Sequence, residues 1–173
     1  MLQDREDAAP AAAAQGEEAP REQGRGQGGG RNRRAWWDEE NDDTDGESAA
    51  VDFVASHVRA KGPGFYDGVL GFSQGAALAA LLCAAVPTDA GGSLFRFAML
   101  YGGYPPRGLA GAMGVPSLHV WGKVDRQVDP RRSEELARMF VKPAVHVHEG
   151  GHFIPTSPDE REVYRAFLES VAK

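Results

Sequence analysis

The stretch that most restricts the fold of this chain lies near its middle and reads YDGVLGFSQGAALAALLCAAV. It places Ser73 between two glycines, where a strand-like apolar run (67–72) meets a helix-like Ala/Leu run (74–86). The pentapeptide GFSQG matches G-x-S-x-G, the nucleophile elbow, in which a strand turns sharply into a helix and exposes the serine hydroxyl. Side chains two residues either side of the serine collide in so tight a turn, which favours glycine at Gly71 and Gly75.

Strand-like and helix-like patterns alternate along the rest of the chain. The pattern predicts further strands at 95–101, 116–122 and 143–149, and further helices at 48–60, 130–141 and 158–171. Such alternation implies a mainly parallel sheet with helices on both faces. The first three strands read as buried central strands, whereas the fourth alternates valine with histidine, which favours an edge position. We therefore predict an α/β fold with a sheet of about four strands flanked by helices.

A serine nucleophile needs a base, and the base needs a group that orients it. In the fold that carries the elbow, the acid and then the histidine follow the serine along the chain. Asp125 follows the third predicted strand and His152 follows the fourth, so both are expected at the edge where open α/β sheets build their sites. Asp129 competes with Asp125, but it precedes Pro130 in an N-cap pattern. We predict Ser73, Asp125 and His152 as a catalytic triad.

The remaining candidate residues have structural interpretations. His57 is expected on a helix surface, and His119 lies inside a strand, where packing is the simpler role. Cys83, the only cysteine, lies in the apolar run LLCAAV and is expected to be a buried thiol. His146 and His148 lack an evident third ligand, so no metal site is predicted. Ser157 begins a capping-box pattern that opens the last helix and limits the loop carrying His152.

The N-terminal segment differs in composition from the rest of the chain. Residues 1–46 hold 6 arginines and 12 acidic residues, so they account for the whole net charge of −6. We predict a low-complexity, disordered segment with a tryptophan pair at 1–46, and a folded domain at 47–173. The glycine-arginine tract within it is followed by an acidic run, which argues against nucleic-acid binding. No apolar stretch is long enough to span a membrane, and we expect a cytoplasmic location, with the nucleus as the alternative.

Three segments, GFSQGAALAALL, LHVWGKVDRQV and EGGHFIP, together resemble the FSH family of serine hydrolases. This family comprises α/β-hydrolase carboxylesterases and includes the ovarian-cancer-associated esterase group. The similarity covers about residues 65–173, and RAWWDEEND also resembles the tryptophan-pair segment of these proteins. It implies hydrolysis of small-molecule carboxylic esters with no cofactor or metal. Ser73 is then the nucleophile, His152 the general base and acid, and Asp125 the residue that orients the histidine.

The resemblance also implies a substrate pocket and an oxyanion hole. Trp36, Trp37, Phe72 and Tyr104 are candidates for lining the acyl pocket, and the N–H of Gln74 is the expected oxyanion donor. Family members begin with strands and a loop that supplies a second donor, which we do not find in residues 1–46. The strand that leads into Ser73 is therefore expected to have an unpaired, apolar edge. We therefore expect a partial α/β-hydrolase with impaired esterase activity. The alternatives are a catalytically silent fragment or interaction module, and an acyl thioesterase.

Overall fold

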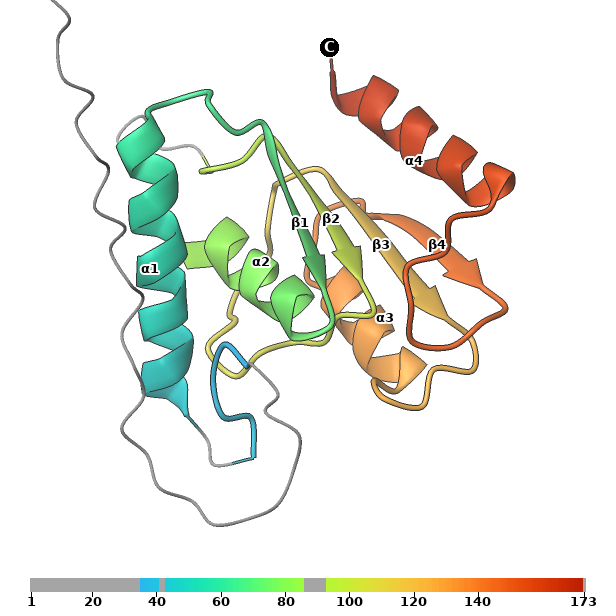
Figure 1. Ribbon diagram of the computed structural model, residues 1–173, viewed down its shortest axis with the longest axis horizontal. Helices are drawn as coiled ribbons and strands as arrows, with labels where there is room; N and C mark the ends of the chain where they lie inside the picture. The colour runs from blue at the N-terminus through green and yellow to red at the C-terminus, as the bar shows by residue number, and fades with distance from the viewer. Residues whose placement is uncertain (1–34, 41–42, 86–92, 173) are drawn as a thin grey trace, which may run out of the picture. The chain divides into compact units, whose positions relative to one another are not determined.

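The computed structural model describes residues 35–40, 43–85 and 93–172 (Figure 1). The predictions for residues 1–34, including the glycine-arginine tract and most of the low-complexity segment, lie outside the described residues. Within the described part, segment 35–40 belongs to the same compact unit as the sheet and its helices.

Four parallel strands form one sheet in the order β1-β2-β3-β4. Their bounds are Gly68–Phe72 for β1, Phe97–Tyr101 for β2, Ser117–Gly122 for β3 and Ala144–His148 for β4. All four predicted strands are therefore present, and the expected α/β class with a parallel sheet is confirmed. The register pairs Phe72 with Tyr101 and Gly122 with His148, which brings the carboxyl ends of neighbouring strands to one edge of the sheet.

Helices cover both faces of the sheet (Figure 1). Their bounds are Thr44–Lys61 for α1, Gln74–Ala85 for α2, Pro130–Arg138 for α3 and Pro158–Val171 for α4. One core cluster joins buried residues of α1, α2 and α3 to one sheet face, and a smaller cluster joins Phe167 of α4 to the other. Along β2 the side chains alternate between these clusters, with Ala98 and Leu100 in the first and Met99 and Tyr101 in the second, as a period of two requires.

The position of β1 agrees with one of two expectations. Its apolar composition indicated a central strand, whereas the family strands not found in residues 1–46 indicated an unpaired edge, and β1 forms one edge of the sheet of the described residues, opposite β4. Leu70 is consequently 60% exposed and Phe72 is partly exposed. The apolar composition of β1 could not reveal this, because composition does not show which strand pairs with which. The edge position predicted for β4 is confirmed, but His148 is its buried residue, whereas Val145 is half exposed.

Several local predictions are confirmed by the structure. The Asp129 carboxylate accepts from the N–H of Arg131 at 2.9 Å and caps α3, and the Ser157 hydroxyl accepts from the N–H of Glu160 at 3.4 Å to cap α4. His119 is buried, bonds the Ser117 hydroxyl at 3.1 Å, and has its pKa lowered to about 4 by desolvation. None of the helices in the described ranges is both long and apolar enough to cross a bilayer.

Candidate active site

The turn between β1 and α2 has the strained geometry expected of a nucleophile elbow. Ser73 adopts a left-handed backbone with φ of 54°, which is uncommon for a residue other than glycine. Its N–H donates to the carbonyl of Tyr101 at 2.8 Å, which fixes the turn to the end of β2. A Cβ on Gly71 would overlap the Gly75 carbonyl and lie 2.6 Å from Ala76 Cα, so position 71 requires glycine.

The second glycine of the motif behaves differently. A Cβ on Gly75 would meet no described atom within 4 Å, and Gly75 has no positive φ. The expectation that sterics favour glycine at both positions is therefore correct for Gly71 and wrong for Gly75 within the described residues. The collision comes from the backbone of α2 crossing over the end of β1, and only the position on β1 faces that crossing.

Asp125 and His152 meet in the way predicted from their order and spacing. His152 Nδ1 lies 2.6 Å from Asp125 Oδ2, and both side chains are almost fully buried. The other carboxylate oxygen, Oδ1, accepts from the backbone N–H groups of Gln127 at 2.8 Å and Val128 at 3.0 Å. These bonds fix the carboxylate, and they leave Nε2 as the ring nitrogen not bonded to it.

The same contacts set the charge of the acid. Desolvation acts to raise the pKa of the Asp125 carboxyl, but the hydrogen bonds from Val128, His152 and Gln127 outweigh it, and the net pKa lies below the ordinary value. Each of these bonds is made to the ionised form and therefore favours it. The carboxylate beside the imidazole is thus ionised at neutral pH.

Gly102 connects the serine to the acid-histidine pair. It directly follows Tyr101, whose carbonyl holds the N–H of Ser73, and it has a positive φ of 51°. A Cβ on Gly102 would lie 3.0 Å from both Nδ1 and Cε1 of His152 and 3.6 Å from Asp125 Oδ2. The imidazole therefore packs directly on the backbone next to the elbow.

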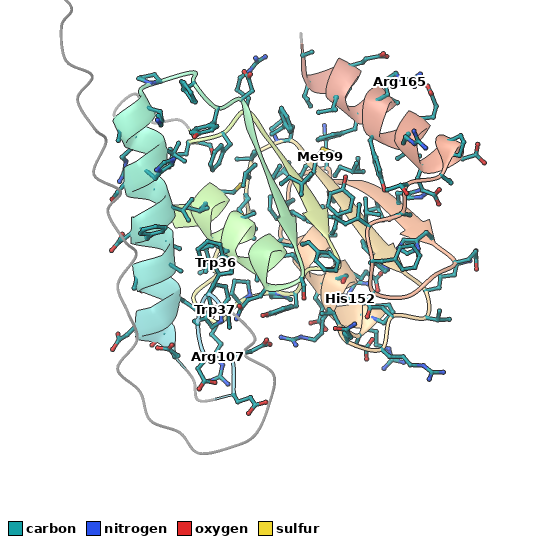
Figure 2. The ribbon with its side chains drawn as sticks, viewed as in Figure 1. Trp36, Trp37, Met99, Arg107, His152 and Arg165 are labelled. Carbon is teal, nitrogen blue, oxygen red and sulfur yellow. The ribbon has the colours of Figure 1, made fainter. Side chains whose placement is uncertain are left out.

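A second contact places the imidazole at the elbow. The ring centroids of His152 and Phe72, the residue before the serine, are 4.6 Å apart. Figure 2 shows His152 at the ends of the central strands, where the loops after β1, β2 and β4 converge. The three predicted triad residues are thus gathered at one place on the carboxyl edge of the sheet.

The start of α2 supplies a candidate oxyanion site. Gln74 is the first residue of α2, and the first N–H groups of an α-helix have no intrahelical partner. The positive end of the helix dipole lies at the same place and favours a developing negative charge. Gln74 therefore has the position predicted for the oxyanion donor.

The four pocket candidates are placed unequally. Phe72 contacts the imidazole, whereas Trp37 and Tyr104 are buried in the core cluster and Trp36 is about half exposed. Trp37 and Tyr104 line a cavity of about 110 Å³ together with Arg132 and acidic residues of segment 35–40 and α1. Neither Ser73 nor His152 is among its lining residues. The described residues do not join all four candidates into one pocket around the serine.

Two contributions to the site were missed by sequence reasoning. Gly102 had a signal that could have found it, because the sequence YGG directly follows a predicted strand. The side chain of Gln74 had none: it bonds the backbone of Trp36 and Trp37, which lie 38 and 37 residues earlier in the chain. Of the residues that the structure describes, no three of His, Cys, Asp and Glu are grouped so that they could hold a metal ion.

Comparison with known proteins identifies the family. A protein-family model described as "Serine hydrolase (FSH1)" matches residues 5–164. The match therefore begins before both stretches in which we expected similarity, residues 65–173 and the segment RAWWDEEND. The mouse (Mus musculus) protein "Esterase OVCA2" is 42% identical over 132 residues, covering 72% of this chain and 57% of that protein. The human (Homo sapiens) protein of the same name is 40% identical over 134 residues, with the same two coverages. The chain thus spans a little over half the length of these esterases.

Solved structures agree on the fold. Zea mays acyl-protein thioesterase 2 aligns with a TM-score of 0.62 at 23% identity, covering 80% of this chain and 73% of that one. A carboxylesterase from Mesorhizobium loti aligns with a TM-score of 0.64 at 19% identity, covering 82% and 71%. At these identities the similarity shows the α/β-hydrolase fold alone. The family match and the relatives at 40–42% identity show that this chain belongs to the FSH1 family of serine hydrolases.

Proposed function

We propose that this chain is a serine carboxylesterase that uses Ser73, His152 and Asp125 as its catalytic triad. The observation that carries the proposal is the 2.6 Å bond between His152 Nδ1 and the Asp125 carboxylate, whose other oxygen accepts from two backbone N–H groups. Ser73, at the same edge of the sheet, has the left-handed backbone of a nucleophile elbow. The esterase names of the relatives support the reaction class.

The steps follow from the roles of these groups. His152 Nε2 takes the proton of the Ser73 hydroxyl as Oγ attacks the ester carbonyl, and the N–H of Gln74 stabilises the resulting oxyanion. The imidazolium then protonates the departing alcohol and leaves an acyl-enzyme. His152 then takes a proton from a water molecule as this water attacks the acyl carbonyl, and the imidazolium returns the proton to Ser73 Oγ as the carboxylic acid leaves. Asp125 stays ionised throughout and holds the imidazole in the tautomer that presents Nε2.

An active-site probe tests the proposal. A fluorophosphonate should label the purified protein at Ser73, and labelling should be lost in Ser73→Ala and reduced in His152→Ala, while both variants keep the far-UV spectrum of the wild type. Hydrolysis of matched oxygen and thiol esters then separates the carboxylesterase from the acyl thioesterase alternative. A folded wild-type protein that neither labels nor turns over ester would instead support the catalytically silent alternative.

A further inference from the structure

The side chain of Gln74 holds a distant segment against the elbow. The N–H of Trp36 donates to Gln74 Oε1 at 2.8 Å, and Gln74 Nε2 donates to the carbonyl of Trp37 at 3.0 Å. One carboxamide thus accepts from the N–H of one residue and donates to the carbonyl of the next. We call residues 35–40 the Trp strap; Figure 2 shows both of its tryptophans between α1 and the start of α2.

Other contacts fasten the Trp strap to the rest of the domain. Trp37 is 6% exposed and belongs to the larger core cluster. Glu39 pairs with Arg132 of α3 at 3.2 Å, and the same guanidinium lies 4.3 Å from the ring centroid of Tyr104. Trp36 is different, because 47% of it remains exposed although its backbone is held at the elbow. An exposed indole whose backbone is bonded to the residue that follows the nucleophile is suited to contact the apolar part of a substrate.

We propose that Gln74 is a positioning residue whose carboxamide fixes the Trp strap at the elbow, so that the Trp36 indole forms a wall for the acyl chain of the ester. This inference rests on the proposed esterase function. The backbone of Gln74 offers the oxyanion donor while its side chain holds the strap, so one residue links the site of charge development to the wall that contacts the acyl chain.

The chemistry of the two hydrogen bonds specifies a carboxamide. Glutamine offers one acceptor and one donor, as the strap requires, whereas an ionised glutamate offers acceptors only and would face the Trp37 carbonyl with an oxygen. A protonated glutamate regains the donor. Methionine has a similar length but leaves both backbone groups of the strap without partners. Gln74→Glu should therefore hold the strap only at low pH, and Gln74→Met at no pH.

Fluorescence quenching tests the position of the strap without any need for activity. In a Trp36→Phe background the remaining tryptophans, Trp37 and Trp121, are 6% and 7% exposed, so acrylamide should quench little of their emission. Adding Gln74→Met should expose Trp37 to acrylamide at every pH. Adding Gln74→Glu should expose Trp37 at pH 8 and protect it again near pH 3.5, below the ordinary glutamate pKa of about 4.3. Quenching equal to that of the background in both variants at pH 8 overturns the proposal.

Kinetics on an acyl-length series tests the effect on specificity. Gln74→Met and Trp36→Ala should each lower kcat/KM for long-chain esters about tenfold relative to acetate, the order of discrimination given by lost methylene contacts. Both should raise KM more than they lower kcat, and both should still label with the fluorophosphonate. An equal loss at every chain length refutes the acyl wall. A wild type that fails to label defeats the proposed function, while the quenching result still decides whether Gln74 holds the strap.

Discussion

Two glycine substitutions in one pentapeptide should have opposite effects on stability. In Gly71→Ala the new methyl would collide with the carbonyl group of Gly75 and lie 2.6 Å from Ala76 Cα. All of these are backbone atoms, so no side chain can rotate away and α2 must move off β1. In Gly75→Ala the methyl meets no described atom, and the backbone there suits an L-residue.

The expected magnitudes follow from these contacts. Overpacking of this kind costs about 1–3 kcal/mol of unfolding free energy. A glycine-to-alanine change at an unstrained site stabilises by about 0.4–1 kcal/mol, because the unfolded chain loses conformational freedom. With a urea m-value of about 2 kcal/mol/M, Gly71→Ala should lower the unfolding midpoint by about 1 M, and Gly75→Ala should raise it by roughly 0.3 M.

Urea unfolding followed by tryptophan fluorescence measures both midpoints, and an unchanged m-value shows that the unfolding reaction is the same. The two variants serve as controls for each other, because each adds one methyl group within the same five residues. A midpoint for Gly71→Ala equal to that of the wild type would refute the steric account of the elbow. A larger loss for Gly75→Ala than for Gly71→Ala would show that the motif, rather than the crossing of α2 over β1, sets the requirement.

Three further predictions concern side chains. Asp125→Asn should lower kcat for ester hydrolysis by about 10⁴-fold through loss of the correct imidazole tautomer. The matched Asp129→Ala should instead cost about 1 kcal/mol in urea unfolding and leave kcat unchanged, because Asp129 only caps α3. Burial raises the pKa of Cys83 to about 12, so iodoacetamide at pH 8 should alkylate it in urea but not in the folded protein. Burial lowers the pKa of His119 from 6.5 to about 4, so the folded state binds fewer protons than the unfolded chain in this interval. The contribution of His119 to the free energy of unfolding is complete above pH 6.5 and declines as the pH falls towards 4. In His119→Asn, urea unfolding at a series of pH values should show a free energy of unfolding without this decline.

Sequence reasoning performed best where a local pattern has a local cause. The caps at Asp129 and Ser157 depend on residues within three positions, and both are present in the structure. The alternation of apolar runs and amphipathic stretches likewise predicted the four strands and the helices among the described residues. The exposure of Leu70 was not predictable in the same way, because it depends on the order of strands in the sheet and not on the sequence of β1.

The candidate site shows the same division. The order serine, aspartate, histidine pointed to three residues, and the structure places them at one edge because parallel strands end together there. The role of the Gln74 side chain could not be read from GFSQG, since its partners are the backbone groups of Trp36 and Trp37. Neither their sequence nor that of the elbow specifies the pairing. Sequence motifs identify groups that react, whereas groups that position them are found through tertiary contacts.

The way the loops are joined explains why the acid and the base meet at all. The loop after β3 is fastened to the end of β4, because the N–H of Lys123 donates to the His148 carbonyl at 2.8 Å and that of Val124 to Gly150 at 3.2 Å. These bonds extend the pairing of the two strands into the loops that carry Asp125 and His152. Gly102 packs against the imidazole with backbone alone. A side chain at position 102 would displace the ring at Nδ1, the atom that bonds the Asp125 carboxylate, so the placement of the base depends on a residue that takes no part in the chemistry.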